Sequence, residues 1–275
     1  MKIKVDDFDL ELTMDSGQVF GFTKDAAKGY TGSLAGVHCR FSQEGNVLAF
    51  DKKEALPRAE AVAHYFDLHH DLSLTYSILE SDEKLRGLGR SLKGLRLIRQ
   101  DAWQGLACFI LSSNNNVKRI QHIHRNLIRH FEQRRKSGLK GFPSALEIAS
   151  SHEGVLRELG LGYRAPFLWA ASKYVAGNPA CLDHIREAEY AEACEKVIAF
   201  PGIGPKVADC VLLYAFQKYE AFPVDVWILR IMRKLYFRNR SVSEKKIQEF
   251  GQKRWGKDAG YVQQYLFHGA RTGII

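Results

Sequence analysis

The segment that most constrains this fold is a glycine-rich turn between two apolar helical stretches, Phe200-Pro-Gly-Ile-Gly-Pro-Lys206. Pro205 suits the first turn of the second helix, because the N–H that proline lacks has no partner to lose there. The pattern is typical of a helix-hairpin-helix, in which Gly202 and Gly204 allow close backbone approach and Ile203 plugs into the core. Free N–H groups at the start of the second helix favour a phosphate. The hairpin therefore predicts contact with a DNA backbone, with an ordinary helix–turn–helix connection as the alternative.

Two ionisable side chains near this hairpin are candidates for chemistry. Lys206 lies in the first helical turn, where the helix dipole disfavours a cation. In a dry pocket, dipole and desolvation would lower its pKa toward a neutral, nucleophilic amine, whereas a surface lysine would only touch phosphate. Asp225 follows 19 residues later, so one helix and one loop can return it to the hairpin. It could stabilise an oxocarbenium-like sugar or only cap the next helix.

Charge is unevenly distributed along the 275 residues. The whole chain carries a net charge of +9, but residues 1–95 hold 12 basic and 15 acidic residues, and residues 96–275 hold 28 and 16. A surplus of this kind predicts a polyanionic partner bound by the last two thirds of the chain. No apolar run reaches the roughly 20 residues that span a bilayer, and the N-terminus has no apolar signal core, so we expect neither a membrane bundle nor secretion.

The cysteines indicate a reducing compartment. They are odd in number, scattered and without a C-x-x-C pair: Cys39, Cys108, Cys181, Cys194 and Cys210. This arrangement argues against a disulfide framework and against a side-chain zinc site. We therefore expect a cytoplasmic protein.

The first third of the chain predicts an α+β domain over residues 1–95. Asp9–Thr13 alternates apolar and polar residues as a half-buried strand does, and Ser16–Gln18 is a turn signal. Val37–Phe41 and Asn46–Phe50 are further β-prone pieces of an antiparallel sheet. Helical pattern begins near Ala59.

Residues 96–275 predict a mostly helical domain. Asp101 can cap a first helix, and Val117 to about Lys136 forms an amphipathic helix with one basic face. Further helices are expected at about 143–151, 164–176, 186–199, 205–217, 225–237 and 243–253. The predicted fold class is thus α+β, an N-terminal antiparallel sheet domain followed by a helical region that holds the hairpin.

Five segments carry a resemblance to a known family, in that family's order. They are Ser16–Phe20, Ser112–Ile120, Leu159–Arg164, Phe200–Cys210 and Gly260–Phe267. Together they resemble the 8-oxoguanine DNA glycosylases of the helix-hairpin-helix-Gly/Pro-Asp superfamily, over nearly the whole chain. The resemblance implies a bifunctional repair enzyme that flips out 8-oxoguanine, preferably opposite cytosine, excises it and cleaves the strand by β-elimination.

The resemblance also implies roles for the residues at the hairpin. Lys206 matches the lysine that attacks C1′ and forms a Schiff base, and Asp225 matches the aspartate that stabilises the developing sugar charge. Trp227 departs from the family, because familiar eukaryotic members carry histidine there. Tryptophan has one N–H donor, so we expect the contact to the neighbouring phosphate to differ.

The base pocket is assigned by the same resemblance. Gly17 matches the residue whose carbonyl accepts the N7 hydrogen that 8-oxoguanine has and guanine lacks. Glycine suits that position, since an approaching base leaves no room for a Cβ. Cys210 and Phe267 match the pair that sandwiches the extruded base, and Gln263 matches the residue that bonds its Watson–Crick edge.

Four residues match those that hold the opened duplex. Asn114 corresponds to the residue that fills the gap, and Tyr163 to the aromatic wedge that kinks the DNA. Arg119 and Arg164 correspond to the pair that bonds the orphaned cytosine, whose acceptor edge suits arginine donors.

The remaining expectations concern cofactors, assembly and alternatives. Four cysteines after the catalytic aspartate would indicate an iron–sulfur cluster, but no cysteine follows Cys210. We expect no required cofactor, a monovalent cation held by hairpin carbonyls as the one candidate ion, and a monomer from a bacterium or archaeon. The alternative functions are a non-catalytic helix-hairpin-helix DNA-binding protein and a glycosylase for another damaged base.

Overall fold

A computed structural model describes residues 1–34, 36–51, 58–135 and 140–275. Its strands are β1 Lys2–Lys4, β2 Thr23–Lys24, β3 Tyr30–Leu34, β4 Val37–Glu44 and β5 Val47–Phe50. Its α-helices are α1 Leu10–Asp15, α2 Ala59–Tyr65, α3 Ser73–Ser81, α4 Leu88–Ser91, α5 Ala102–Ser112, α6 Val117–Glu132, α7 Ala145–Ala149, α8 Glu153–Leu156, α9 Ala165–Gly177, α10 Cys181–Glu187, α11 Tyr190–Ile198, α12 Pro205–Phe216, α13 Val226–Tyr236, α14 Glu244–Trp255 and α15 Ala259–Thr272. The predicted α+β fold class is confirmed.

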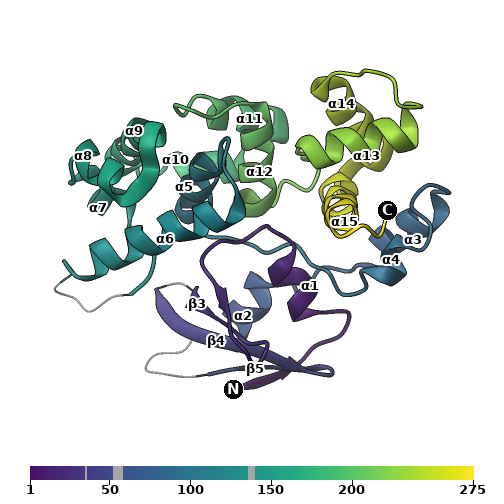
Figure 1. Cartoon of the computed structure of the whole chain (residues 1–275), viewed down its shortest axis with the longest axis horizontal. Helices are drawn as coiled ribbons and strands as arrows, with labels where there is room; N and C mark the ends of the chain where they lie inside the picture. The colour runs from purple at the N-terminus through teal and green to yellow at the C-terminus, as the bar shows by residue number, and fades with distance from the viewer. Residues whose placement is uncertain (35, 52–57, 136–139) are drawn as a thin grey trace.

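The N-terminal sheet is antiparallel throughout, with strand order β1-β5-β4-β3-β2. Alternate residues of its central strands are buried, including Cys39 and Phe41 on β4 and Leu48 and Phe50 on β5. One face is therefore apolar, as the two-residue period of a half-buried strand requires. Helices α1 and α2 cover the sheet in Figure 1.

The predicted strand at Asp9–Thr13 is wrong, because these residues enter helix α1. The Asp9 carboxylate accepts a hydrogen bond from the Leu12 backbone N–H at 2.8 Å and caps the helix. The buried residues are Leu10, Thr13 and Met14, whose spacing of three and four fits a helix. A single N-cap and this longer period outweigh the short alternation.

The helices pack into a larger core that also takes in leucines from the first third of the chain. Leu79, Leu88 and Leu95 belong to this helical cluster, whereas the sheet cluster ends with Ile98. The division at residue 95 stays a prediction. In Figure 1, α15 lies beside α3 and α4, and α6 runs between the helical layer and the sheet.

Two helix predictions need correction. The expected helix at 186–199 is two helices, because the chain is extended at Ala188 and Glu189. The Lys218 ammonium donates to the Arg186 and Ala188 carbonyls, at 3.0 and 2.5 Å, and so satisfies the end of α10. Helix α6 ends at Glu132, and Lys136 of the predicted stretch lies outside the described residues.

No helix within the described ranges is both long and apolar enough to cross a bilayer.

Candidate active site

The predicted helix-hairpin-helix is present, built from α11, a tight turn and α12. Gly202 has a φ of +80°, and a Cβ there would lie 2.4 Å from the Phe167 ring, so glycine is required. Gly204 faces open space at the N-cap of α12, and Pro205 is the first helical residue. Ile203 is buried beneath the turn, as predicted. The first N–H groups of α12 are consequently open to an anion.

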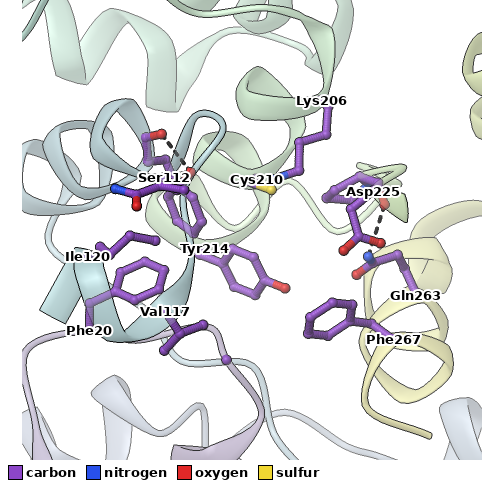
Figure 2. Close-up of a pocket in the computed structure, with 14 residues that line it drawn as sticks. Phe20, Ser112, Val117, Ile120, Lys206, Cys210, Tyr214, Asp225, Gln263 and Phe267 are labelled. Carbon is purple, nitrogen blue, oxygen red and sulfur yellow. Dashed lines mark hydrogen bonds between the residues drawn. The ribbon is translucent and has the colours of Figure 1, made fainter. Parts of the chain in front are cut away.

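A cavity of about 160 Å³ lies next to the start of α12. Figure 2 shows Lys206 and Cys210 on one side of it, and Asp225, Gln263 and Phe267 on the other. The remaining lining residues are Gly17, Phe20, Phe109, Ser112, Asn115, Val117, Ile120, Tyr214 and Pro223. The cavity thus brings together all six residues that sequence reasoning assigned to catalysis and base binding, from four separate segments.

Lys206 extends along α12 to the Cys210 sulfur, one helical turn away (Figure 2). The nearby Cys210 sulfur and, more weakly, the Asp225 carboxylate raise the pKa of the Lys206 ammonium, against the lowering effect of burial. Burial raises the pKa of the Cys210 thiol to about 11. The pKa of Lys206 in the free protein therefore shifts in the direction opposite to our expectation, because the neighbouring groups outweigh desolvation. Lys206 has to lose a proton before it can act as a nucleophile.

Asp225 caps helix α13, as predicted. Its Oδ1 accepts from the Trp227 and Ile228 backbone N–H groups, at 3.0 and 2.8 Å. Burial raises the pKa of the carboxyl group, and the two N–H donors and Lys206 oppose that rise. The cap uses Oδ1, and the Asp225 side chain lines the cavity beside Gln263 (Figure 2). Capping and a catalytic role are thus compatible.

The Gln263 side chain is only 3% exposed, and one of the two polar atoms of its amide has a hydrogen-bond partner among the described residues. Its Nε2 donates to the Pro223 carbonyl at 2.9 Å, which fixes the amide orientation. Its Oε1 is buried and has no protein partner among the described residues. An unpaired buried acceptor is costly, so this oxygen is a candidate to receive an N–H from a ligand.

Gly17 lies on the cavity wall with a φ of +85°, a conformation that favours glycine. A Cβ there would lie 2.3 Å from Nη1 of Arg271 and 3.4 Å from the Phe267 ring. The group that crowds Gly17 is therefore this arginine, and not only an incoming base as we expected. Sequence reasoning missed Arg271, although Gln263, Phe267 and Arg271 are spaced by four on one face of α15.

Two of the four residues expected to hold open DNA, Tyr163 and Arg164, donate to the same carbonyl. The Tyr163 hydroxyl donates to the Ser113 carbonyl at 3.1 Å, and Arg164 donates to it through Nε and Nη2 at 2.8 and 2.6 Å. Arg164 also donates to the Asn114 carbonyl at 2.7 Å and lies over the Tyr163 ring. Asn114 itself is exposed, with a φ of +47°. Arg164 is 7% exposed, so it shapes this loop in the free protein.

Other predicted DNA-contact residues are freely accessible. Arg119 is exposed on α6 and donates to the Gly160 carbonyl at 3.2 Å. Tyr163 is 49% exposed, as a wedge requires. Val226 and Trp227 are exposed at the start of α13, 60% and 38%, immediately after Asp225. A large aromatic therefore stands where the sequence departs from the family.

A second feature that sequence reasoning missed lies behind the hairpin. Asp209 is 1% exposed, and it accepts from the Tyr190 hydroxyl at 2.5 Å and from Gln248 Nε2 at 2.6 Å. Burial raises the pKa of its carboxyl group to about 6. These bonds tie α12 to α11 and α14.

Within the described ranges, no three His, Cys, Asp or Glu side chains are grouped to hold a metal ion.

Family models match most of the chain. Residues 1–106 match the N-terminal domain of 8-oxoguanine DNA glycosylase, and residues 107–257 match the HhH-GPD superfamily of base excision DNA repair proteins. A probable N-glycosylase/DNA lyase of Methanothermobacter thermautotrophicus is 33% identical, across 100% of this chain and 97% of that protein.

Two solved structures are similar over the full length. One is MBOgg1 in complex with a low-affinity DNA ligand, with a TM-score of 0.92, 31% identity and coverage of 100% of this chain and 96% of that one. The other is the 8-oxoguanine glycosylase/lyase of Clostridium acetobutylicum in complex with double-stranded DNA containing cytosine opposite 8-oxoguanine, with a TM-score of 0.89, 28% identity and coverage of 100% and 99%. The chain belongs to the HhH-GPD superfamily and, within it, to the 8-oxoguanine DNA glycosylases.

Proposed function

We propose that this chain is a bifunctional DNA glycosylase/lyase that excises 8-oxoguanine opposite cytosine and then cleaves the strand. The observation that carries the proposal is the position of Lys206 and Asp225 on one cavity with Gln263 and Phe267. A DNA-binding module needs the hairpin but has no use for this cavity. The names of the similar proteins, an N-glycosylase/DNA lyase and an 8-oxoguanine glycosylase/lyase, support the same reaction.

In this mechanism, the neutral Lys206 amine attacks C1′ of the extruded nucleotide, and the base leaves with the electron pair of the glycosidic bond and gains a proton. Asp225, ionised, stabilises positive charge on the sugar. The sugar ring then opens to a Schiff base, a C2′ proton is lost and the C3′–O bond breaks with the phosphate as leaving group. The nucleotide displaces water from the cavity, which disfavours the charged ammonium and promotes loss of its proton.

Recognition of the lesion would use groups on the side of the cavity opposite Lys206, together with Cys210. The unpaired Gln263 Oε1 suits the N–H donors on the Watson–Crick edge of a guanine-type base. The Gly17 carbonyl would accept the N7 hydrogen of 8-oxoguanine, and guanine offers no hydrogen there. Phe267 and Cys210 would lie on the two faces of the base.

The DNA would be held by the hairpin and by the basic face of α6. Arg119 and the first residue of α12, Pro205, are exposed, and each lies next in sequence to a residue that lines the cavity, Ile120 and Lys206. We propose that Arg119 and Arg164 bond the orphaned cytosine, with Asn114 in the gap and Tyr163 as the wedge. Because these steps use only side chains and backbone groups of the protein, the proposal calls for no metal or organic cofactor.

The test is excision from duplexes that carry 8-oxoguanine opposite each of the four bases. The expected result is cleavage at the lesion, fastest opposite cytosine. Cleavage of abasic DNA without any excision of 8-oxoguanine would indicate a different damaged base. Binding to all four duplexes with no cleavage would indicate a non-catalytic DNA-binding protein and would overturn the proposal.

A further inference from the structure

The turn that carries Gly17 is held by donors from helix α15. The Asp15 carbonyl accepts a hydrogen bond from Arg271 Nη2, and the Ser16 carbonyl accepts one from Gln264 Nε2 at 3.3 Å. Among the described residues, no donor reaches the Gly17 carbonyl, the next along the chain. Two neighbouring carbonyls are thus occupied, and the carbonyl of Gly17, which lines the cavity, is free among the described residues.

Arg271 does more than donate one hydrogen bond. Its guanidinium lies against the bare Cα of Gly17, where a Cβ would come within 2.3 Å of Nη1. The same guanidinium lies over the Phe267 ring, 5.4 Å from the centroid. A planar, delocalised group of this kind can stack and donate at once, which a lysine cannot. Arg271 therefore sets the separation between Gly17 and Phe267.

The turn is already attached to the rest of the protein without α15. The Gln18 side chain donates to the Thr13 and Arg96 carbonyls, at 3.2 and 2.8 Å. The Gln18 carbonyl in turn accepts from Gln100 Nε2 at 2.6 Å. These bonds secure the segment to helix α1 and to the stretch from Arg96 to Gln100, so the contacts from α15 add alignment with the residues that line the cavity.

We propose that Arg271 and Gln264 are positioning residues that orient the Gly17 carbonyl toward the base. The proposal rests on the function proposed above, in which that carbonyl accepts a hydrogen from the lesion. Gln264 is itself oriented, because its Oε1 accepts from the Tyr214 hydroxyl at 2.5 Å. The chain from Tyr214 through Gln264 to the Ser16 carbonyl therefore links one side of the cavity to the other.

The experiment compares two reactions of the same full-length variant. Arg271→Ala should slow single-turnover excision of 8-oxoguanine opposite cytosine about tenfold, the effect of about one net hydrogen bond. Cleavage of a preformed abasic site should stay within about twofold of wild type, since no base is present to be read. Arg233→Ala is the matched control, because Arg233 also donates to a backbone carbonyl, that of Val242, at 2.6 Å. It should leave both rates unchanged.

Cleavage of abasic DNA also reports whether the variant is folded. An equal loss of excision and abasic cleavage in Arg271→Ala would overturn the positioning role, as would wild-type excision. If the alanine variant does not fold, Arg271→Lys should show the same selective loss, at about threefold. Failure of the wild-type protein to excise 8-oxoguanine would instead contradict the proposed function.

Discussion

The two sides of the active-site cavity are assembled in different ways. The hairpin wall, made by Lys206 and Cys210, comes from consecutive turns of one helix and follows directly from a local motif. The reading wall comes from segments about 250 residues apart and depends on contacts between them; it consists of Gly17, Gln263, Phe267 and Arg271. The difference implies that chemistry and base recognition can be separated by mutation. Removal of the Lys206 amine from the hairpin wall should abolish both reactions, and changes in the reading wall should impair excision alone.

The largest effect is expected for Lys206→Gln. Removal of the amine leaves no nucleophile at C1′, so excision and borohydride trapping should fall by at least about 10⁴-fold. DNA affinity should change little, because the hairpin N–H groups remain. The rates are measured under single turnover, with binding followed by fluorescence anisotropy. Wild-type excision by this variant would remove Lys206 from the mechanism.

The second prediction concerns the support behind the hairpin wall. The Asp209 carboxyl group has a pKa of about 6 in the folded protein, raised by burial from 3.8. Between about pH 4 and pH 6, the folded state therefore keeps a proton that the unfolded state has already lost. The free energy of unfolding falls as pH rises through that range. The loss is about 3 kcal/mol.

Asp209→Asn should remove this pH dependence, since an amide does not titrate and still accepts from Tyr190. Urea unfolding of both proteins at pH 4 and pH 7 measures it. Parallel changes in wild type and variant would show that folding does not raise the pKa of Asp209.

The third prediction concerns the reading wall. Gln263→Leu removes the unpaired Oε1 acceptor and should slow excision of 8-oxoguanine about 30-fold, because the N–H donors of the base would enter the cavity without partners. Abasic cleavage should persist near the wild-type rate. Assays of the two substrates with one enzyme preparation give the ratio directly. An equal loss of both activities would contradict the separation of chemistry from base recognition.

The smallest effect is expected outside both walls. Arg119→Ala should reduce the preference for cytosine over adenine opposite the lesion by about tenfold, because one set of donors to cytosine is lost. Arg164→Ala is a less specific test, since Arg164 also holds the Ser113 and Asn114 carbonyls and should slow excision opposite every base. The measurement is the single-turnover excision rate of 8-oxoguanine opposite cytosine and opposite adenine. An unchanged cytosine-to-adenine ratio in Arg119→Ala would argue against contact with the orphaned base.

The helix-hairpin-helix and the cap of α13 could be predicted from the sequence because their determinants are local. Pro205 at the first helical position, the plug at Ile203 and the cap at Asp225 each act within a few residues. The error at Asp9–Thr13 arose because an alternation of only five residues predicted a strand. The Asp9 N-cap, whose contribution depends on tertiary burial, favours a helix there.

Features that depend on distant neighbours were not predictable in the same way. The raised pKa of Lys206 follows from how close Cys210 and Asp225 come in the fold, which spacing alone did not reveal. The close approach of Arg271 to Gly17 joins residues that lie 254 positions apart along the chain. A helix predicted over residues 259–272 would have placed Arg271 on the same face as Gln263 and Phe267.

The most direct test of the mechanism is borohydride trapping on a duplex that contains 8-oxoguanine opposite cytosine, followed by mass spectrometry of the digested complex. A Schiff base at C1′ predicts one covalent adduct, on the peptide that contains Lys206. Excision of the base with no trapped adduct, or an adduct on another lysine, would contradict it.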